Sequence, residues 1–165
     1  MTWYYNDEPF TSEMIGDYVG FVYVITDKSN GLKYIGKKGL ISKRRMPPLK
    51  GKKRRRTKII ETDWQDYYGS SESVKLLVEE KGRETFHREI LRLCKKKAEM
   101  SYYEAKLQFE SDCLLYPDQY YNEFIGCKVN RWHLLTKTKK KTLMKIIYIL
   151  SGLTQITMSI HDVVL

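Results

Sequence analysis

The chain has 165 residues and a net charge of +10, with 42% hydrophobic and 13% aromatic residues. This length suits one domain with a real core rather than two, and the composition excludes an intrinsically disordered chain. Its three cysteines, Cys94, Cys113 and Cys127, form no C-x-x-C pair, so neither a disulfide framework nor a zinc ribbon is indicated. The polar, acidic start predicts no signal peptide, and we expect a cytoplasmic, intracellular protein without a membrane partner.

Two short aromatic strands joined by a tight turn follow a polar arm over residues 1–19. The strands are predicted at about 20–26 and 32–38, and Asn30-Gly31 between them tolerates the positive φ of a hairpin turn. Alternation gives the first strand two largely apolar faces: Phe21, Tyr23 and Ile25 on one, Val22 and Val24 on the other. We therefore expect an antiparallel pair in which the first strand is central in its sheet.

A strongly basic segment follows this hairpin directly. From Lys37 to Lys58 the chain has twelve Lys or Arg and no Asp or Glu, which leaves 18 basic and 20 acidic residues elsewhere. Such a local basic excess is typical of a surface that binds a polyanion, and a solvated loop or a localisation signal is the alternative. Pro47-Pro48 and Gly51 exclude one long helix, so we expect a mobile loop that orders on its partner.

A helix and a strand are predicted after the basic segment. The helix runs over about 71–80, where Ser70 or Ser71 can cap its start and Gly82 ends it. A third strand is predicted at 86–93, although the periodicity alone leaves a helix open there.

A second helix is predicted from about Lys97 to Cys113. Met100, Tyr103 and Leu107 form its apolar stripe, and Pro117 stops it. Farther on, the run from Ile146 to His161 has no Asp, Glu, Lys or Arg, but it is shorter than the roughly 20 apolar residues of a membrane helix. We expect a peripheral helix or strand there.

The order of these elements and four sequence segments resemble the GIY-YIG nuclease superfamily. The first motif reads Gly20-Phe21-Val22-Tyr23, one residue longer than the shortest form, and the second is Tyr34-Ile35-Gly36. The segments 34–38, 47–53, 63–70 and 102–106 resemble the phage-encoded Seg-type homing endonucleases more closely. The resemblance covers about residues 1–132, with a core at 18–125, and leaves residues 133–165 as an extension of unknown role.

This resemblance implies the fold and the reaction. The fold would be of the α/β (α+β) type, a small, mostly antiparallel three-stranded sheet flanked by helices. The reaction would be hydrolysis of phosphodiester bonds in double-stranded DNA with one divalent ion, Mg²⁺ or Mn²⁺. Whether the enzyme nicks or cuts both strands, and whether a transient dimer forms to do so, stays open.

The resemblance also assigns catalytic roles to particular residues. Tyr23 and Tyr34 would project to one sheet face, where cations could lower the pKa of a phenol that acts as general base. Which of the two takes the proton stays open. Arg44 would stabilise charge on the phosphorus, a task for which Arg45, Lys37 and Lys38 are further candidates. Asn122 would close the site by hydrogen bonding.

Glu104 is the predicted metal ligand. It lies beside the apolar stripe of the second helix, where an unpaired carboxylate is costly and a divalent ion would supply the missing partner. An ion pair with Lys97 or Lys106 is the alternative, and Glu99 and Glu110 lie on the same helix. The predicted DNA-binding cations are Lys37, Lys38, Arg45, Lys52, Lys53, Arg54, Arg55 and Arg56.

Other classes fit the sequence less well. Glu104-Ala105-Lys106 spells the E-x-K of PD-(D/E)xK nucleases, but its context predicts a helix instead of a strand. The histidines, His87, His133 and His161, are isolated, which disfavours an H-N-H nuclease. The alternative from another class is a basic nucleic-acid-binding protein without catalysis, which would tolerate the loss of Glu104.

Overall fold

A computed structural model describes residues 2–134, 138–140, 142–144 and 146–147 of the chain. The chain divides into two compact units, residues 1–129 and residues 130–165. The second unit begins with the short helix α3 (Arg131–Leu134), and most of the predicted apolar run at 146–161 lies outside the described residues. Within the described part, no helix is both long and apolar enough to cross a membrane.

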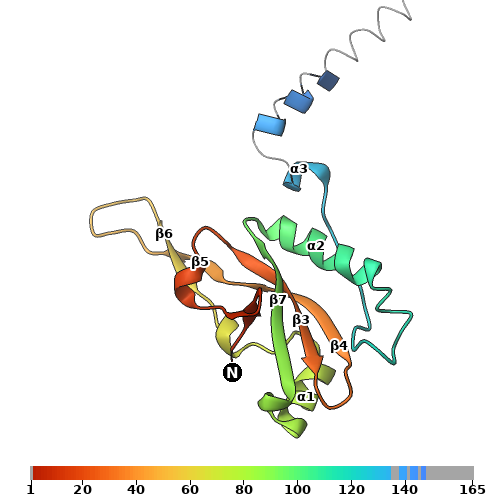
Figure 1. The fold of residues 1–165 in the computed structure, drawn as a ribbon. Coiled ribbons are helices and arrows are strands. Elements are labelled where there is room, and N and C mark those ends of the chain that lie inside the picture. The colour runs from red at the N-terminus through yellow and green to blue at the C-terminus, as the bar shows by residue number, and fades with distance from the viewer. Residues whose placement is uncertain (1, 135–137, 141, 145, 148–165) are drawn as a thin grey trace, which may run out of the picture. The chain divides into compact units, whose positions relative to one another are not determined.

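The first unit is built on a five-stranded sheet with the order β2-β1-β7-β3-β4 (Figure 1). Its strands are β1 (Tyr4–Tyr5), β2 (Glu8–Pro9), β3 (Gly20–Asp27), β4 (Lys33–Gly39) and β7 (Phe86–Cys94). The antiparallel strands β7, β3 and β4 match the predicted ones, and β3 is central as expected. The prediction of three strands is wrong, because the N-terminal arm adds β1 and β2 beyond β7. Each is two residues long, too short for alternation to mark it.

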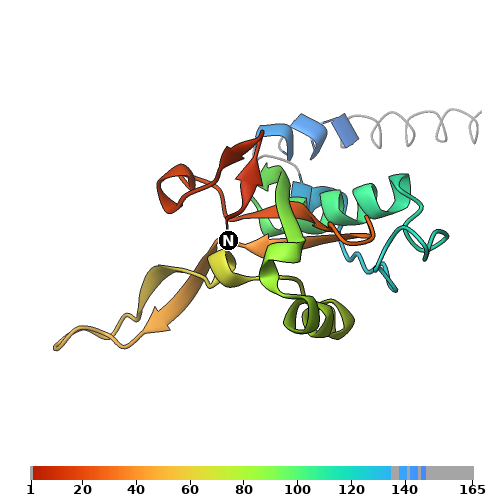
Figure 2. The same cartoon turned by 60° about the horizontal axis from the view of Figure 1, so that its bottom comes forward.

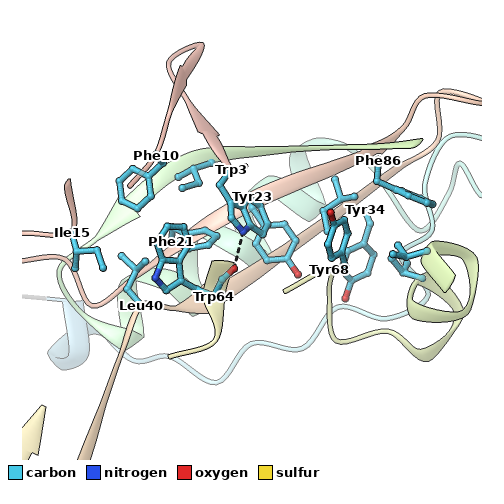
Figure 3. Close-up of a cluster of buried hydrophobic side chains, with 14 residues drawn as sticks. Trp3, Phe10, Ile15, Phe21, Tyr23, Tyr34, Leu40, Trp64, Tyr68 and Phe86 are labelled. Atoms are coloured by element: carbon cyan, nitrogen blue, oxygen red, sulfur yellow. Dashed lines mark hydrogen bonds between the residues drawn. The ribbon is translucent and has the colours of Figure 1, made fainter. Parts of the chain in front are cut away.

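Both faces of β3 are buried, against different layers. Phe21, Tyr23 and Ile25 belong to a large cluster that also takes Val74 and Val78 from α1 (Glu72–Lys81). Figure 3 shows how aromatic side chains from separate segments fill this cluster, in which the Trp3 indole donates to the Trp64 carbonyl at 2.8 Å. On the opposite face, Val22 packs with side chains of α2 (Lys97–Glu110), including Met100. The sheet is thus covered by α1 on one side and α2 on the other (Figure 2).

The helix α2 ends three residues before the predicted Cys113. The Cys113 N–H bonds back to the Gln108 carbonyl at 3.2 Å, and Asp112 adopts a positive φ of 48°. This left-handed residue turns the chain and buries the Cys113 side chain completely. The helix therefore stops at a local C-terminal motif and not at Pro117.

The basic segment forms a hairpin instead of the mobile loop predicted for it. Strands β5 (Ile41–Met46) and β6 (Arg56–Glu61) make a separate two-stranded antiparallel sheet that projects from the central one (Figures 1 and 2). Its base is fastened by the Thr62 N–H, which donates to the Leu40 carbonyl at 2.9 Å. Pro47-Pro48 and Gly51 lie in the tip that connects the two strands, where the backbone makes no strand-to-strand hydrogen bonds that proline would interrupt.

The turn between β3 and β4 is organised by the buried carboxylate of Asp27. Asp27 accepts hydrogen bonds from the Ser29 N–H at 2.9 Å, the Lys81 ammonium at 2.6 Å and the Tyr121 hydroxyl at 2.9 Å. Burial alone would raise the pKa of this carboxyl group, but these donors outweigh it and lower the pKa to about 2. One side chain thereby joins the hairpin, the end of α1 and the 119–122 segment.

Gly36 has no side chain because the Tyr23 ring fills that space. The two residues are cross-strand partners, and a Cβ atom on Gly36 would lie 2.4 Å from the Tyr23 hydroxyl and 2.7 Å from its Cζ. Real Cβ atoms do not approach this closely, so any side chain here would displace the ring. The glycine of the Tyr34-Ile35-Gly36 motif is thus a requirement of packing.

We predict that Gly36→Ala destabilises the fold by about 1–2 kcal/mol through this overpacking. The midpoint of urea denaturation measures the loss. Gly39→Ala is the matched control on the same strand, because its Cβ atom would meet nothing closer than 3.8 Å. An equal shift of the midpoint in both variants would contradict the explanation.

Candidate active site

A polar cavity of about 600 Å³ opens along β4 at the edge of the central sheet. It contains three of the five predicted catalytic residues, together with Lys37 and Gln108. The lining residues are Tyr34, Lys37, Ser70, Ser71, Glu72, Ser73, Glu104, Gln108, Tyr121, Asn122, Glu123, Phe124 and Gly126. Because β4 is an edge strand, side chains from both of its faces reach the same space.

Tyr34 reaches the cavity from the face that carries the large aromatic cluster. Its ring is buried in that cluster at 8% exposure, and its hydroxyl lies 3.2 Å from Ser70 Oγ. The ring of Tyr23 is 6.3 Å away between centroids, so the two phenols do share one face as predicted. Tyr34 is the member of the pair that lines the cavity.

Tyr23 itself lies outside the lining of the cavity. Its side chain is fully buried, and its hydroxyl has no hydrogen bond of ordinary geometry to a described residue. Burial, reinforced by the neighbouring Tyr67 and Tyr34, raises the pKa of Tyr23 well above its usual range. The expectation that nearby cations lower a phenol pKa is therefore not met at Tyr23.

Glu104 reaches the cavity from α2, on the opposite face of β4. Its carboxylate is paired with the Lys37 ammonium, and not with Lys97 or Lys106. The side chain of Glu104 is only 14% exposed, against 34% for Lys37. Burial raises the pKa of Glu104, and the hydrogen bond and charge of Lys37 oppose that rise. The carboxylate thus lies in a place where a positive partner is needed.

Asn122 completes the edge of β4 with its side chain. Its Oδ1 accepts from the Ile35 N–H at 2.9 Å, and its Nδ2 donates to the Ile35 carbonyl at 2.8 Å. Backbone pairing along this edge starts two residues earlier. There the Lys33 N–H donates to the Gln119 carbonyl and the Lys33 carbonyl accepts from the Tyr121 N–H, both at 2.8 Å. The amide imitates the next residue of a neighbouring strand, so Asn122 fixes the cavity wall to the sheet.

Arg44 is not among the residues that line the cavity. It lies on β5, exposed, and is paired across the hairpin with Lys58. Most of the predicted DNA-binding cations also lie away from the cavity, since Arg45 on β5, the tip residues 52–55 and Arg56 on β6 are exposed on the hairpin. Lys38 serves the fold, because it donates to Asp63 at 2.7 Å and lies 3.8 Å above the centre of the Tyr67 ring.

The carboxylates of this region suit a divalent ion that keeps part of its water shell. Among the described residues there is no group of three or more His, Cys, Asp or Glu, which argues against a cage made entirely of protein ligands. Mg²⁺ does not need such a cage, because it keeps several waters and takes one or two carboxylates plus substrate phosphates. A desolvated carboxylate at a polar, open cavity, with Glu72 and Glu123 on the same lining, fits that requirement.

Two polar residues of this region escaped the sequence analysis. Gln108 donates to the Ile35 carbonyl at 3.0 Å, one helical turn after Glu104, and so fixes α2 to β4. Arg88 is 1% exposed on β7 and donates to the carbonyls of Gln65 and Tyr67 at 2.9 and 3.0 Å. The apolar pattern of a strand does not indicate a buried arginine. The i, i+4 spacing of Glu104 and Gln108, in contrast, places both side chains on one face of the predicted helix, and that signal was present in the sequence.

The comparisons with known proteins agree with this arrangement. Residues 3–125 match the family model described as "Putative endonuclease segE, GIY-YIG domain". No curated protein and no solved structure matches the chain. The family match spans most of the chain, including β3, β4, α2 and every residue that lines the cavity except Gly126. The chain therefore belongs to the Seg-type branch of the GIY-YIG endonuclease superfamily.

Proposed function

We propose that this chain is a metal-dependent homing endonuclease that hydrolyses phosphodiester bonds of double-stranded DNA. The observation that carries the proposal is the joint presence of Tyr34, Lys37 and Glu104 on one polar cavity at the edge of β4. A phenol can orient or accept a proton, an ammonium can stabilise charge on a phosphate, and a desolvated carboxylate can hold a divalent ion. The nuclease domain would comprise residues 1–132, with residues 133–165 as an extension.

Glu104 would hold one divalent ion, Mg²⁺ or Mn²⁺, with its carboxylate. When bound, such an ion supplies Lewis-acid polarisation of a phosphoryl oxygen. Lys37 is paired with that carboxylate, and its ammonium would stabilise the negative charge of the phosphate at the same place. The ion pair supplies the positive partner that the buried carboxylate needs.

Tyr34 is our candidate for the phenol that orients or deprotonates the attacking water. It lines the cavity, and its hydroxyl has Ser70 as a partner for the proton. Tyr23 would act as a positioning residue instead, because its buried ring packs on Gly36 and against Tyr34. Asn122 would keep the cavity wall on β4. Arg44 would contribute from the hairpin, on the DNA that the hairpin binds.

The partner would be duplex DNA, held by the basic hairpin that follows β4. The proposed contacts are Lys37, Arg45, Lys52, Lys53, Arg54, Arg55 and Arg56, whereas Lys38, which the sequence also suggested, is engaged by Asp63. A transient dimer would bring a second cavity to the second strand. The three free cysteines agree with a reducing compartment, and we place the protein in the cytoplasm of a phage-infected cell.

The two tyrosines separate the proposed roles in one cleavage assay with supercoiled plasmid. We expect cleavage with Mg²⁺ and none with EDTA, and a fall of at least about 100-fold for Tyr34→Phe. Tyr23→Phe, the matched control, removes a hydroxyl without a hydrogen bond of ordinary geometry and should stay within about tenfold of the parent. Equal losses would contradict the division of labour. DNA binding without cleavage under any metal would instead favour a binding protein.

A further inference from the structure

The β5–β6 hairpin has no partner in the central sheet. Its strands pair only with each other, over six residue pairs from Ile41–Glu61 to Met46–Arg56. Ile59 is 59% exposed, and the tip residues 47–55 are exposed throughout. A lone two-stranded ribbon is marginally stable in water, so this one needs a surface to lie on.

The two faces of the ribbon differ in what they contact. One face begins with Ile41 and Glu61, of which Ile41 packs on the large buried cluster and Glu61 accepts hydrogen bonds from Ser12 and Trp64. This face turns toward the body of the unit at the base of the hairpin. The other face begins with Ser42 and Ile60, which are half-buried at the base, and beyond them Arg44, Lys58 and Arg56 are exposed.

This second face carries three of the five cations of the paired strands. Beyond its first pair it has Arg44 opposite Lys58 and then Met46 opposite Arg56. Like charges directly across a ladder repel each other, and no ion pair within the described residues compensates them. The hairpin has no acidic residue before Glu61. Such a face is stabilised by a polyanion that supplies acceptors at the same spacing.

The dimensions and chemistry of the ribbon fit the major groove of B-form DNA. The groove is about 12 Å wide and admits a two-stranded β-ribbon. Strands of six residues are roughly 20 Å long, enough to follow the groove past several base pairs. Arginine pairs bidentately with O6 and N7 of guanine, and the cations of the tip within residues 52–55 would reach the flanking phosphates.

We propose that the β5–β6 hairpin lies in the major groove of the DNA target and reads guanines through Arg44 and Arg56, which are exposed on the same face of the ribbon. The proposal rests on the proposed function only in taking duplex DNA as the partner. It gives the chain a source of sequence specificity within residues 41–61, and it assigns Arg44 to base recognition.

The test is selection of random duplex DNA by the full-length protein in EDTA, where no cleavage is required. The variants are Arg44→Lys and Arg56→Lys, which keep the charge and lose the planar fork, and the matched control is Arg83→Lys, an exposed arginine outside the hairpin. Circular dichroism should show the parent fold in all three, because these side chains are exposed. Methylation of guanine N7 in the selected sites then probes the major groove directly.

We expect a guanine-containing motif, and at least about fivefold weaker binding when its N7 atoms are methylated. Arg44→Lys and Arg56→Lys should each lose the preference for a different guanine, while Arg83→Lys keeps the motif. The same motif in all variants, no effect of N7 methylation, equal affinity for duplex RNA, or no binding to duplex DNA would each overturn the proposal. A base preference without any cleavage in Mg²⁺ would contradict the nuclease function and support the hairpin's role.

Discussion

Glu104→Gln is expected to slow metal-dependent DNA cleavage by about 10³-fold, which corresponds to roughly 4 kcal/mol of transition-state stabilisation. The amide keeps the shape of the side chain but lacks the charge that would hold a divalent ion next to the phosphate. DNA affinity in EDTA should stay within about twofold, because Lys37 and the hairpin cations are retained. Single-turnover cleavage rates and binding isotherms on the same duplex separate the two effects.

Glu110→Gln is the matched control for this prediction. Glu110 lies on the same helix but outside the cavity, in an exposed ion pair with Lys106 at 2.5 Å. Exposed pairs of this kind contribute little to stability, so the cleavage rate should be nearly that of the parent. Cleavage by Glu104→Gln at the parent's rate would remove Glu104 from the mechanism.

Asp27→Asn is expected to lower the free energy of unfolding by about 2–3 kcal/mol at neutral pH. The substitution takes a buried charged acceptor away from Ser29, Lys81 and Tyr121. Lys81 is 28% exposed, so water screens part of the ion pair and the loss falls short of that for a fully buried pair. Urea denaturation should show a lower midpoint with an unchanged slope. Asp66→Asn, in an exposed pair with Arg83 at 3.6 Å, should leave the midpoint almost unchanged.

The effect of Asp27→Asn should also depend on pH. The pKa of Asp27 is about 2 in the folded protein, below its ordinary value of 3.8. A lowered pKa means that the folded state favours the ionised carboxylate, so its contribution is complete above the unfolded pKa and is lost as the pH falls toward 2. The difference between parent and variant should therefore shrink between about pH 4 and pH 2. A difference that is constant over this range would show that ionisation of Asp27 is not its source.

The elements that the sequence predicted well are those set by local patterns. Alternation placed Phe21 and Val22 on opposite faces of β3, and helical spacing placed Met100 and Leu107 on the buried stripe of α2. These patterns depend on residues close in the chain, so no tertiary information is needed. The motif around Tyr34 indicated the family for the same reason, because its residues are consecutive in the chain.

Other features depend on contacts between distant segments. The pairing of Lys37 with Glu104 joins residues 67 positions apart, and no spacing rule selects one lysine from 30 basic residues. Asn122 could be expected near the site, but its two hydrogen bonds to Ile35 follow only from the position of β4 at the sheet edge. The hairpin of β5 and β6 was missed because its strands carry charges where apolar alternation is the usual signal.

The side chain of Asn122 also bears on how the protein behaves at high concentration. An open sheet edge presents a row of N–H and C=O groups to which another chain can add a strand, a common start of aggregation. At the β4 edge, Lys33 is covered by the 119–121 backbone and Ile35 by the Asn122 amide, and the long charged side chain of Lys37 follows. At the far edge, β2 is two residues long and ends in Pro9, which has no N–H to offer. Both edges of the central sheet are thereby protected against growth by strand addition.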